Sequence, residues 1–236
     1  MTIIDFHTHI LPGIDDGSKD WKMTTQMLQK AEKCGIKLLI ATPHFYADRM
    51  QLDEFMEKRK KIFPECFKLA KECGIVLLCG SEVAFFRGIS KAENIDKLCI
   101  SGTNLMLIEM PFREWEQSDL DELQSLRRRG ITPVIAHLER FYGYQKDENL
   151  IKALFRMPVY IQLNASCFLN WKTKKRGFDL MTQNHVHFLG SDCHNTTTRP
   201  ENIDEARKVI GKKFGEKTLN EFDRCSVEII NKHRIG

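Results

Sequence analysis

Short apolar segments alternate with longer amphipathic segments along the whole chain. The apolar segments are rich in Ile, Leu and Val, which is typical of buried strands in a parallel sheet. We expect seven strands, at residues 2–6, 36–41, 75–79, 105–108, 133–136, 159–163 and 186–189.

The segments between these strands predict helices. We expect them at residues 21–34, 52–72, 116–129, 147–155 and 174–184, with two more after the last strand at 200–210 and 216–224. Gly35, Gly74 and Gly130 each stand between a predicted helix and a predicted strand, where a C-cap glycine is expected. Seven such units without an evident linker predict an α/β fold, a closed or nearly closed β/α barrel forming one domain over residues 1–236.

Composition and charge narrow the class of protein. The chain has 236 residues, 42% of them hydrophobic, and no apolar run long enough for a transmembrane helix. We expect a cytoplasmic protein, because no secretory signal is evident and the eight cysteines form no C-x-x-C pair. The net charge is +4, but the basic residues are mixed with acidic ones. This favours solvated helix faces over a nucleic-acid-binding surface or membrane insertion.

Histidines and carboxylates follow the predicted strands at their C-terminal ends. In a parallel barrel these ends lie on one rim, where active sites form. His7 and His9 are also two residues apart, so in a strand they point to the same side. The candidate metal ligands are His7, His9, Asp16, His44, Glu82, Glu109, His137, Asp192 and His194.

This ligand set predicts two or three divalent ions. Imidazole and carboxylate ligands suit Mn²⁺, Fe²⁺ or Zn²⁺, and manganese is the metal we expect. Nine ligands exceed what one ion needs, so we expect the ions to share a bridging carboxylate. Three such ions outweigh the four candidate carboxylates in charge and would attract an anionic substrate. Paired ions can also stabilise the attacking and leaving oxygens of a phosphoryl displacement.

Two arginines are candidates for phosphate binding. Arg140 and Arg199 each follow a rim histidine, and a guanidinium matches phosphate oxygens. The alternative for each is a salt bridge at the rim. Asn164 could support a metal-bound water or cap a loop.

Other reactive residue types are interpreted as structural. His185 and His187 precede the rim, and we expect His233 to be solvated in the C-terminal tail. Cys193 and Arg199 spell the C-x5-R pattern of cysteine-dependent phosphatases, but no glycine lies between them to free the backbone for phosphate. We therefore expect Cys193 to face away from the metals and to take no part in the chemistry.

The motifs ILPGIDDG, TPH, GSE, IEMP, AHLER and GSDCH resemble those of a known family. The chain is similar to the polymerase-and-histidinol-phosphatase (PHP) superfamily. Within it, the motifs resemble the bacterial metal-dependent protein-tyrosine phosphatases encoded beside capsule and exopolysaccharide genes. The resemblance covers nearly the whole chain and implies a distorted seven-stranded β/α barrel with three metals, often manganese or iron.

The resemblance also implies how the ligands are shared among the ions. It assigns His7, His9, Glu82 and Asp192 to one ion, Glu82, Glu109 and His137 to a second, and Asp16, His44 and His194 to a third. Arg140 and Arg199 match the phosphate-binding arginines of the family. The implied substrate is the tail of a membrane-associated tyrosine kinase that controls polysaccharide export.

The sequence therefore predicts a phosphomonoesterase that hydrolyses protein phosphotyrosine by means of a metal-activated hydroxide. Two alternatives stay open. One is a small-molecule phosphatase of the same superfamily, such as a histidinol-phosphate phosphatase. The other is a non-catalytic, metal-bound regulator that binds a phosphorylated peptide.

Overall fold

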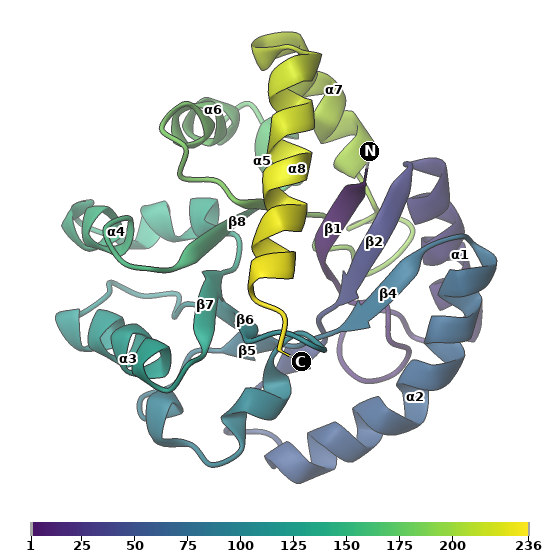
Figure 1. Cartoon of the computed structure of the whole chain (residues 1–236), viewed down its shortest axis with the longest axis horizontal. Coiled ribbons are helices and arrows are strands. Elements are labelled where there is room, and N and C mark those ends of the chain that lie inside the picture. The colour runs from purple at the N-terminus through teal and green to yellow at the C-terminus, as the bar shows by residue number, and fades with distance from the viewer. Residues whose placement is uncertain (1, 236) are drawn as a thin grey trace.

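A curled parallel sheet covered by helices forms the protein, as seen in a computed structural model that describes residues 2–235 (Figure 1). The strands are β1 (Ile3–Thr8), β2 (Ile36–Ala41), β3 (His44–Phe45), β4 (Val76–Cys79), β5 (Glu82–Ala84), β6 (Leu105–Glu109), β7 (Thr132–Ile135), β8 (Tyr160–Asn164) and β9 (Phe188–Gly190). The α-helices are α1 (Trp21–Lys33), α2 (Leu52–Glu72), α3 (Gln117–Arg128), α4 (Asn149–Leu154), α5 (Ser166–Leu169), α6 (Lys174–Thr182), α7 (Ile203–Phe214) and α8 (Glu216–Lys232). Short 3₁₀ helices are η1 (Ile89–Lys91), η2 (Ile95–Leu98) and η3 (Leu138–Tyr144).

The strands of this curled sheet fall into two hydrogen-bonded parts, with the orders β1-β2-β4 and β3-β5-β6-β7-β8-β9. The prediction of seven strands is corrected at two points, because β3 and β5 are separate short strands. Thr42 and Pro43 separate β2 from β3, and Pro43 has no backbone N–H for a sheet ladder. The backbone N–H groups of Gly80 and Glu82 still donate to the carbonyls of Ala41 (2.7 Å) and Pro43 (3.0 Å) across this gap.

The first and last strands of the chain lie side by side. Thr8 at the end of β1 forms a parallel bridge with Cys193 after β9. The backbone N–H of His9 donates to the Cys193 carbonyl (2.9 Å), and that of Asp192 donates to the His7 carbonyl (2.7 Å). This β1–β9 seam brings two ligand-rich segments together that are far apart in the sequence.

Two hydrophobic clusters lie on opposite sides of the curled sheet. The inner one is formed by alternating strand residues, as expected for strands buried on both faces, and by α8 from the C-terminal end of the chain (Figure 1). Its buried members are Ile4, Phe6, Ile40, Ile100, Leu105, Leu107, Val134, Ala136, Phe188 and Ile230. The larger outer cluster fills the space between the sheet and the apolar faces of the helices.

Most predicted helices are confirmed, with boundary changes. The helix predicted at residues 52–72 coincides with α2, whereas α8 extends to Lys232, beyond the predicted end at residue 224. The expectation of a solvated His233 is wrong. Its imidazole is half-buried and hydrogen-bonds to Asn104 Oδ1 (2.8 Å) and Tyr160 Oη (3.1 Å), because the chain after α8 packs against the N-terminal ends of the strands.

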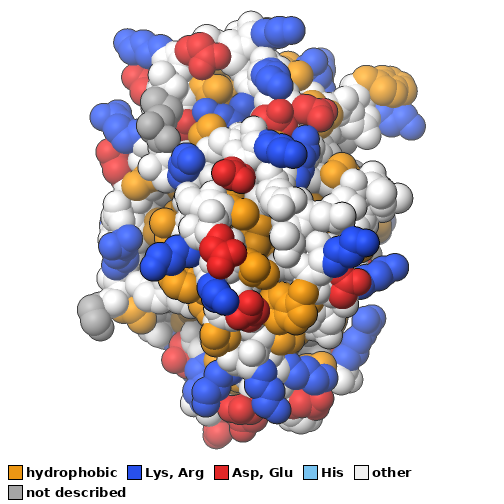
Figure 2. Space-filling view, turned by 90° about the vertical axis from the view of Figure 1, so that its right-hand side faces the viewer, with side chains coloured by type: hydrophobic (Ala, Val, Ile, Leu, Met, Phe, Trp, Pro, Cys, Tyr) orange, Lys and Arg blue, Asp and Glu red, His pale blue; other side chains and the backbone are white. Residues whose placement is uncertain are grey.

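Within residues 2–235, no helix has both the length and the apolar character needed to cross a membrane. On the face that carries α1 and α2, basic and acidic side chains are interspersed, with hydrophobic side chains exposed between them (Figure 2). This face has no concentrated charge of one sign.

Candidate active site

His7 and His9 point to a common position at the end of β1, as the sequence predicts. Their Nε2 atoms lie 3.0 Å apart. A register shift in the β1–β2 pairing between Asp5 and Thr8 marks a bulge-like irregularity where His7 lies. Each ring is fixed through its other nitrogen: His9 Nδ1–H donates to Asp15 Oδ2 (2.7 Å) and His7 Nδ1–H donates to Gln162 Oε1 (3.2 Å). Both Nε2 atoms are thereby left free to bind a metal.

The buried Glu82 carboxylate lies at the centre of the site. Its Oε2 is 3.2 Å from His7 Nε2, 3.3 Å from His9 Nε2 and 2.9 Å from His44 Nδ1. Its Oε1 accepts a hydrogen bond from His137 Nε2 (2.8 Å). Burial alone would raise the pKa of this carboxyl group, but His7 and the other imidazoles hold it well below its usual range. Glu82 is therefore an anion placed among four histidines.

The candidate ligands form three overlapping groups whose ligand atoms lie within 4.8 Å of one another. The groups are His9, Asp16, His44 and His194; His7, His9 and Glu82; and His44, Glu82 and Glu109. His9 and His44 each belong to two groups, which differs from the division implied by the family resemblance. Asp16 is exposed at the rim, and its Oδ1 lies 3.4 Å from His194 Nε2.

His137 and Asp192 lie at the edges of these groups. His137 Nε2 is 3.3 Å from Glu109 Oε1, and Asp192 Oδ1 is 3.4 Å from His9 Nε2. Both residues have a positive φ, 31° and 53°, which is uncommon for residues other than glycine and often marks functional sites. The structure thus brings all nine predicted ligands to one region of the rim.

Several buried atoms of this region fit the presence of bound metal. Within residues 2–235, Glu82 Oε2, His44 Nδ1 and His194 Nε2 are buried and have no partner with hydrogen-bond geometry, although the first two lie 2.9 Å apart. Burial and the nearby His9 lower the pKa of His194 to about 4, so its imidazole is neutral at neutral pH. Buried polar atoms without partners are costly, and cation ligation would satisfy all three. The donor set is imidazole and carboxylate, which suits Mn²⁺, Fe²⁺ or Zn²⁺.

Three polar residues support the ligands. The sequence did not single out Asp15 and Gln162 as functional residues, whereas Asn164 was a candidate. Besides Asp15 and Gln162, the amide of Asn164 donates to Asp192 Oδ2 (2.9 Å). Gln162 Nε2 in turn donates to Asn164 Oδ1 (2.9 Å), which links His7 to Asp192 through β8. The only available signal was the pair of amides at alternate positions of an otherwise apolar strand. This contact gives Asn164 a role in positioning Asp192, besides the two roles considered from the sequence.

Arg140 and Arg199 converge on the same carboxylate. Arg199 Nη2 lies 2.7 Å from Asp192 Oδ2, and Arg140 Nη2 contacts the same oxygen. The arginine side chains are 37% and 39% exposed, so both guanidinium groups are accessible from the rim. The structure thus shows the alternative, a salt bridge at the rim. An external anion can also reach both guanidinium groups at this position.

Cys193 does not have the surroundings of a nucleophile. Its thiol is buried and donates to the Asn195 carbonyl (Sγ–O 3.5 Å), and burial raises its pKa above the ordinary value. It lies towards α1, in a cavity lined also by Met27 and Lys30. These observations agree with the expectation that the C-x5-R match is coincidental, because a nucleophilic cysteine needs a lowered pKa.

Exposed aromatic side chains border the site next to His137. Phe112 and Tyr144 are each 46% exposed, and their rings meet edge to face with centroids 5.5 Å apart. The Phe112 ring lies nearly parallel to the His137 imidazole at 6.3 Å. An aromatic group bound at the rim would find a complementary surface here.

The curled parallel sheet, with histidine and carboxylate clusters at its C-terminal edge, defines an α/β protein with a site for divalent metals. The chain belongs to the capsular polysaccharide synthesis CpsB/CapC family, whose model matches residues 3–230. This confirms the resemblance that the motifs show.

Similar proteins of known name support this assignment. The chain is 26% identical to tyrosine-protein phosphatase CpsB of Streptococcus agalactiae serotype V, over 99% of this chain and 100% of that protein. It is 29% identical to tyrosine-protein phosphatase YwqE of Bacillus subtilis, over 90% of this chain and 85% of that protein. A crystal structure from work on YwqE and Streptococcus pneumoniae CpsB, described as metal-dependent tyrosine phosphatases, superposes with a TM-score of 0.84 at 25% identity, covering 99% of this chain and 96% of that chain.

Proposed function

We propose that this protein is a metal-dependent phosphomonoesterase that hydrolyses phosphotyrosine in a protein substrate. The observation that carries the proposal is the buried Glu82 carboxylate, which lies within 3.3 Å of nitrogen atoms from four histidines. Such an arrangement is typical of a multi-metal centre with a bridging carboxylate. The names of the S. agalactiae and B. subtilis relatives support phosphotyrosine as the substrate group.

Two or three ions, with manganese as the expected metal, would occupy the three ligand groups. The proposed ligands are His7, His9, Asp16, His44, Glu82, Glu109, His137, Asp192 and His194. Bound divalent ions would supply a water of lowered pKa and positive charge for the phosphoryl oxygens. Glu82 would bridge two ions, since its two oxygens face different histidines.

The chain's own residues bind and orient the phosphoester. Arg140 and Arg199 would turn from Asp192 Oδ2 to the phosphoryl oxygens, where two guanidinium groups stabilise the negative charge. Phe112 and Tyr144 would contact the phenyl ring of phosphotyrosine. Phenolate is a fairly good leaving group, because the pKa of a tyrosine hydroxyl is about 10. A strong general acid is therefore unnecessary.

The wider setting of the enzyme is part of the proposal. Residues 1–236 would form one phosphatase domain, a distorted seven-stranded barrel in which β2 continues into β3 and β4 into β5. The backbone hydrogen bonds at Gly80 and Glu82 support this continuity. Eight free cysteines favour the cytoplasm. The family description favours a role in capsular polysaccharide synthesis, and the proposed substrate is the tail of a membrane-associated tyrosine kinase.

The test is phosphate release by the metal-free protein, before and after Mn²⁺ is restored. A phosphotyrosine peptide and histidinol phosphate are compared as substrates. Mn²⁺-dependent release from the peptide alone supports the proposal. A preference for histidinol phosphate would assign a small-molecule substrate to the same site, and tight peptide binding with very slow turnover would indicate a regulator.

A matched pair of variants tests whether the metal cluster does the chemistry. Glu82→Gln keeps the side-chain size but removes the central charge, and we expect it to lose Mn²⁺ binding and activity. Glu57→Gln makes the same change at an exposed position on α2, and we expect wild-type activity. Activity that persists in the fully metal-free protein would overturn the proposal.

A further inference from the structure

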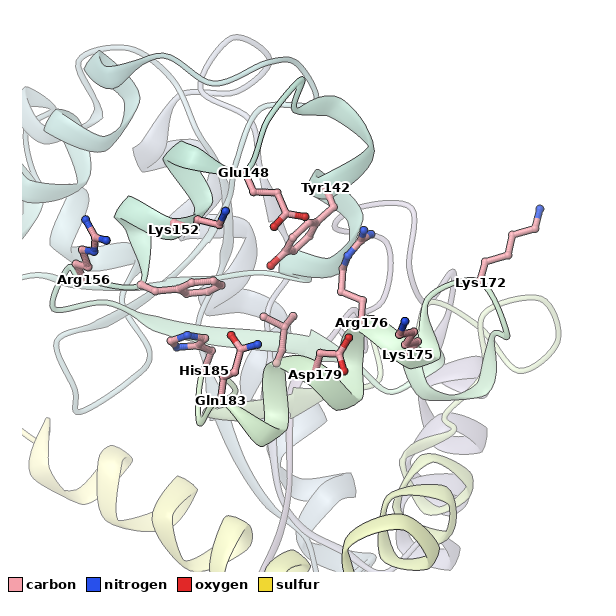
Figure 3. Close-up of a pocket in the computed structure, with 12 residues that line it drawn as sticks. Tyr142, Glu148, Lys152, Arg156, Lys172, Lys175, Arg176, Asp179, Gln183 and His185 are labelled. Atoms are coloured by element: carbon pink, nitrogen blue, oxygen red, sulfur yellow. The ribbon is translucent and has the colours of Figure 1, made fainter.

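A second concave site, which shares no residue with the metal-ligand cluster, lies between α4 and α6 (Figure 3). Its volume is about 620 Å³, within the range of sites that bind organic ligands. The cations that line it are Lys152, Arg156, Lys172, Lys175 and Arg176. The two carboxylates at the same cavity, Glu148 and Asp179, leave an excess of three positive charges.

These cations are available for an external anion. In the part of the chain that the structure describes, residues 2–235, none of the five takes part in an ion pair, whereas Lys58 pairs with Glu54 (2.9 Å) and Lys208 with Asp204 (3.2 Å) on other helices. Arg176 instead lies over the Tyr142 ring, with its guanidinium carbon 4.1 Å from the ring centroid. Lys152 and Arg176 lie on opposite sides of that ring, while Lys172 extends away from the cavity (Figure 3).

The cavity also offers apolar surface to a bound chain. The Phe155 and His185 rings stack at 3.9 Å with an interplanar angle of 5°, and both line the cavity. A peptide that carries carboxylates would match this cavity. Its carboxylates would face the cations, and its apolar atoms would contact the rings.

One edge of the cavity lies close to the metal-ligand cluster. Tyr142 follows Arg140 by two residues within η3, and residues two apart in a chain are separated by at most ~7 Å between Cα atoms. One edge of the cavity therefore lies next to an arginine that contacts Asp192. A peptide with its phosphotyrosine at the cluster needs only a few further residues to reach Lys152 and Arg176.

We propose that the cavity between α4 and α6 binds acidic residues of the same protein segment whose phosphotyrosine occupies the metal site. This inference rests on the proposed phosphatase function and adds a substrate preference to it. The positive excess attracts the acidic segment, and its contacts hold the phosphotyrosine near the arginines. The preference acts on binding, so it changes KM and leaves kcat nearly constant.

Paired peptides and paired variants test the proposal in the Mn²⁺-loaded protein. One phosphotyrosine peptide carries a run of glutamates, and its partner carries glutamines at the same positions. We expect the wild type to favour the acidic peptide by about two- to thirtyfold in kcat/KM at low salt, the range for two exposed ion pairs. Lys152→Gln/Lys175→Gln should remove most of this preference, and high salt should do the same in the wild type.

Two controls distinguish an effect of the cavity from an effect of net charge and from an effect on catalysis. Lys58→Gln/Lys60→Gln removes the same charge from α2, and it should keep the preference. The small substrate p-nitrophenyl phosphate cannot reach the cavity while it is being hydrolysed. The wild type and both double variants should therefore have the same kcat/KM on it within a factor of two.

The outcomes distinguish this inference from the phosphatase proposal. Equal kcat/KM for the two peptides, or a preference that survives in Lys152→Gln/Lys175→Gln, overturns the cavity inference alone. If no phosphoester is hydrolysed, the phosphatase proposal fails. Binding of a fluorescent acidic peptide without phosphotyrosine still tests the cavity in that case: weaker binding by the cavity variant supports the inference, and equal binding overturns it.

Discussion

Replacing Gly190 by alanine is expected to disturb the active site through steric overlap. A Cβ atom at position 190 would lie 2.6 Å from His7 Cβ and 2.7 Å from Gln162 Nε2. The closer distance is about 0.8 Å shorter than the 3.4 Å at which ordinary contact begins. Either β9 or the His7 and Gln162 side chains must therefore move by most of an ångström.

The size of the effect follows from that displacement. Overpacking of this kind costs about 1–3 kcal/mol of folding free energy. A shift of about 1 Å in a positioned group can lower the rate of a reaction by about 10²-fold. Because His7 is a proposed metal ligand, we expect Gly190→Ala to lose about 10²-fold in kcat/KM, about 2.7 kcal/mol of transition-state stabilisation, in addition to its loss of stability.

Gly143→Ala is the matched control for this prediction. Apart from the two neighbouring residues, no atom of residues 2–235 lies within 4 Å of a Cβ at position 143, and its φ is not positive, so the same substitution meets no obstacle there. Urea unfolding measures stability, and Mn²⁺-dependent phosphate release measures activity. Wild-type activity and stability in Gly190→Ala would refute the argument that close packing of β9 against β1 and β8 sets the ligand geometry.

Three further changes give distinct outcomes. Asp15→Asn removes the anion that accepts from His9 Nδ1–H, and we expect the Kd for Mn²⁺ to rise about 10- to 100-fold in a calorimetric titration. Cys193→Ser should retain most activity on a phosphotyrosine peptide, because the thiol is buried and not activated. Burial, with a smaller contribution from His185, lowers the pKa of His187 to about 4, so the unfolded chain binds an extra proton between about pH 4 and 6.5. Stability is therefore lost as the pH falls through this window, by up to about 3 kcal/mol, and His187→Gln should reduce that loss in urea unfolding of the metal-free protein.

Each of these predictions has a control or a refuting result. Asp121→Asn on α3 removes an exposed carboxylate and should leave Mn²⁺ affinity unchanged. Inactive Cys193→Ser with metals still bound would contradict a purely metal-based mechanism. If His187→Gln loses as much stability as the wild type between pH 6.5 and 4, another group dominates that window.

The strand pattern was sufficient to place the candidate ligands on one rim. The rule that parallel strands carry active sites at their C-terminal ends brought His44, Glu82 and Asp192 together from distant parts of the sequence. The alternation of His7 and His9 gave their common direction. These inferences depend only on periodicity and order, which a single sequence shows.

Finer features depended on contacts that periodicity does not encode. β3 and β5 contain only two and three residues, too few to give an alternating pattern. The hydrogen bond between His7 and Gln162 joins residues 155 positions apart, and no local sequence pattern predicts it. The sharing of His9 and His44 between ligand groups depends on ring placement after the strands end. The hydrogen bonds of His233 depend on where the C-terminal end of α8 lies in the folded protein.

The β1–β9 seam fixes the order in which this protein can be completed during its synthesis. His7 and His9 emerge from the ribosome first, and Asp192 follows about 185 residues later. Until β9 arrives, one edge of β1 has unpaired backbone groups and the Glu82 cluster lacks its neighbours from the C-terminal part of the chain. A nascent chain can therefore offer an incoming ion only part of its ligands. With the proposed ligands, full metal affinity would arise only after translation has passed His194, and metal loading would be a late step in the maturation of this protein.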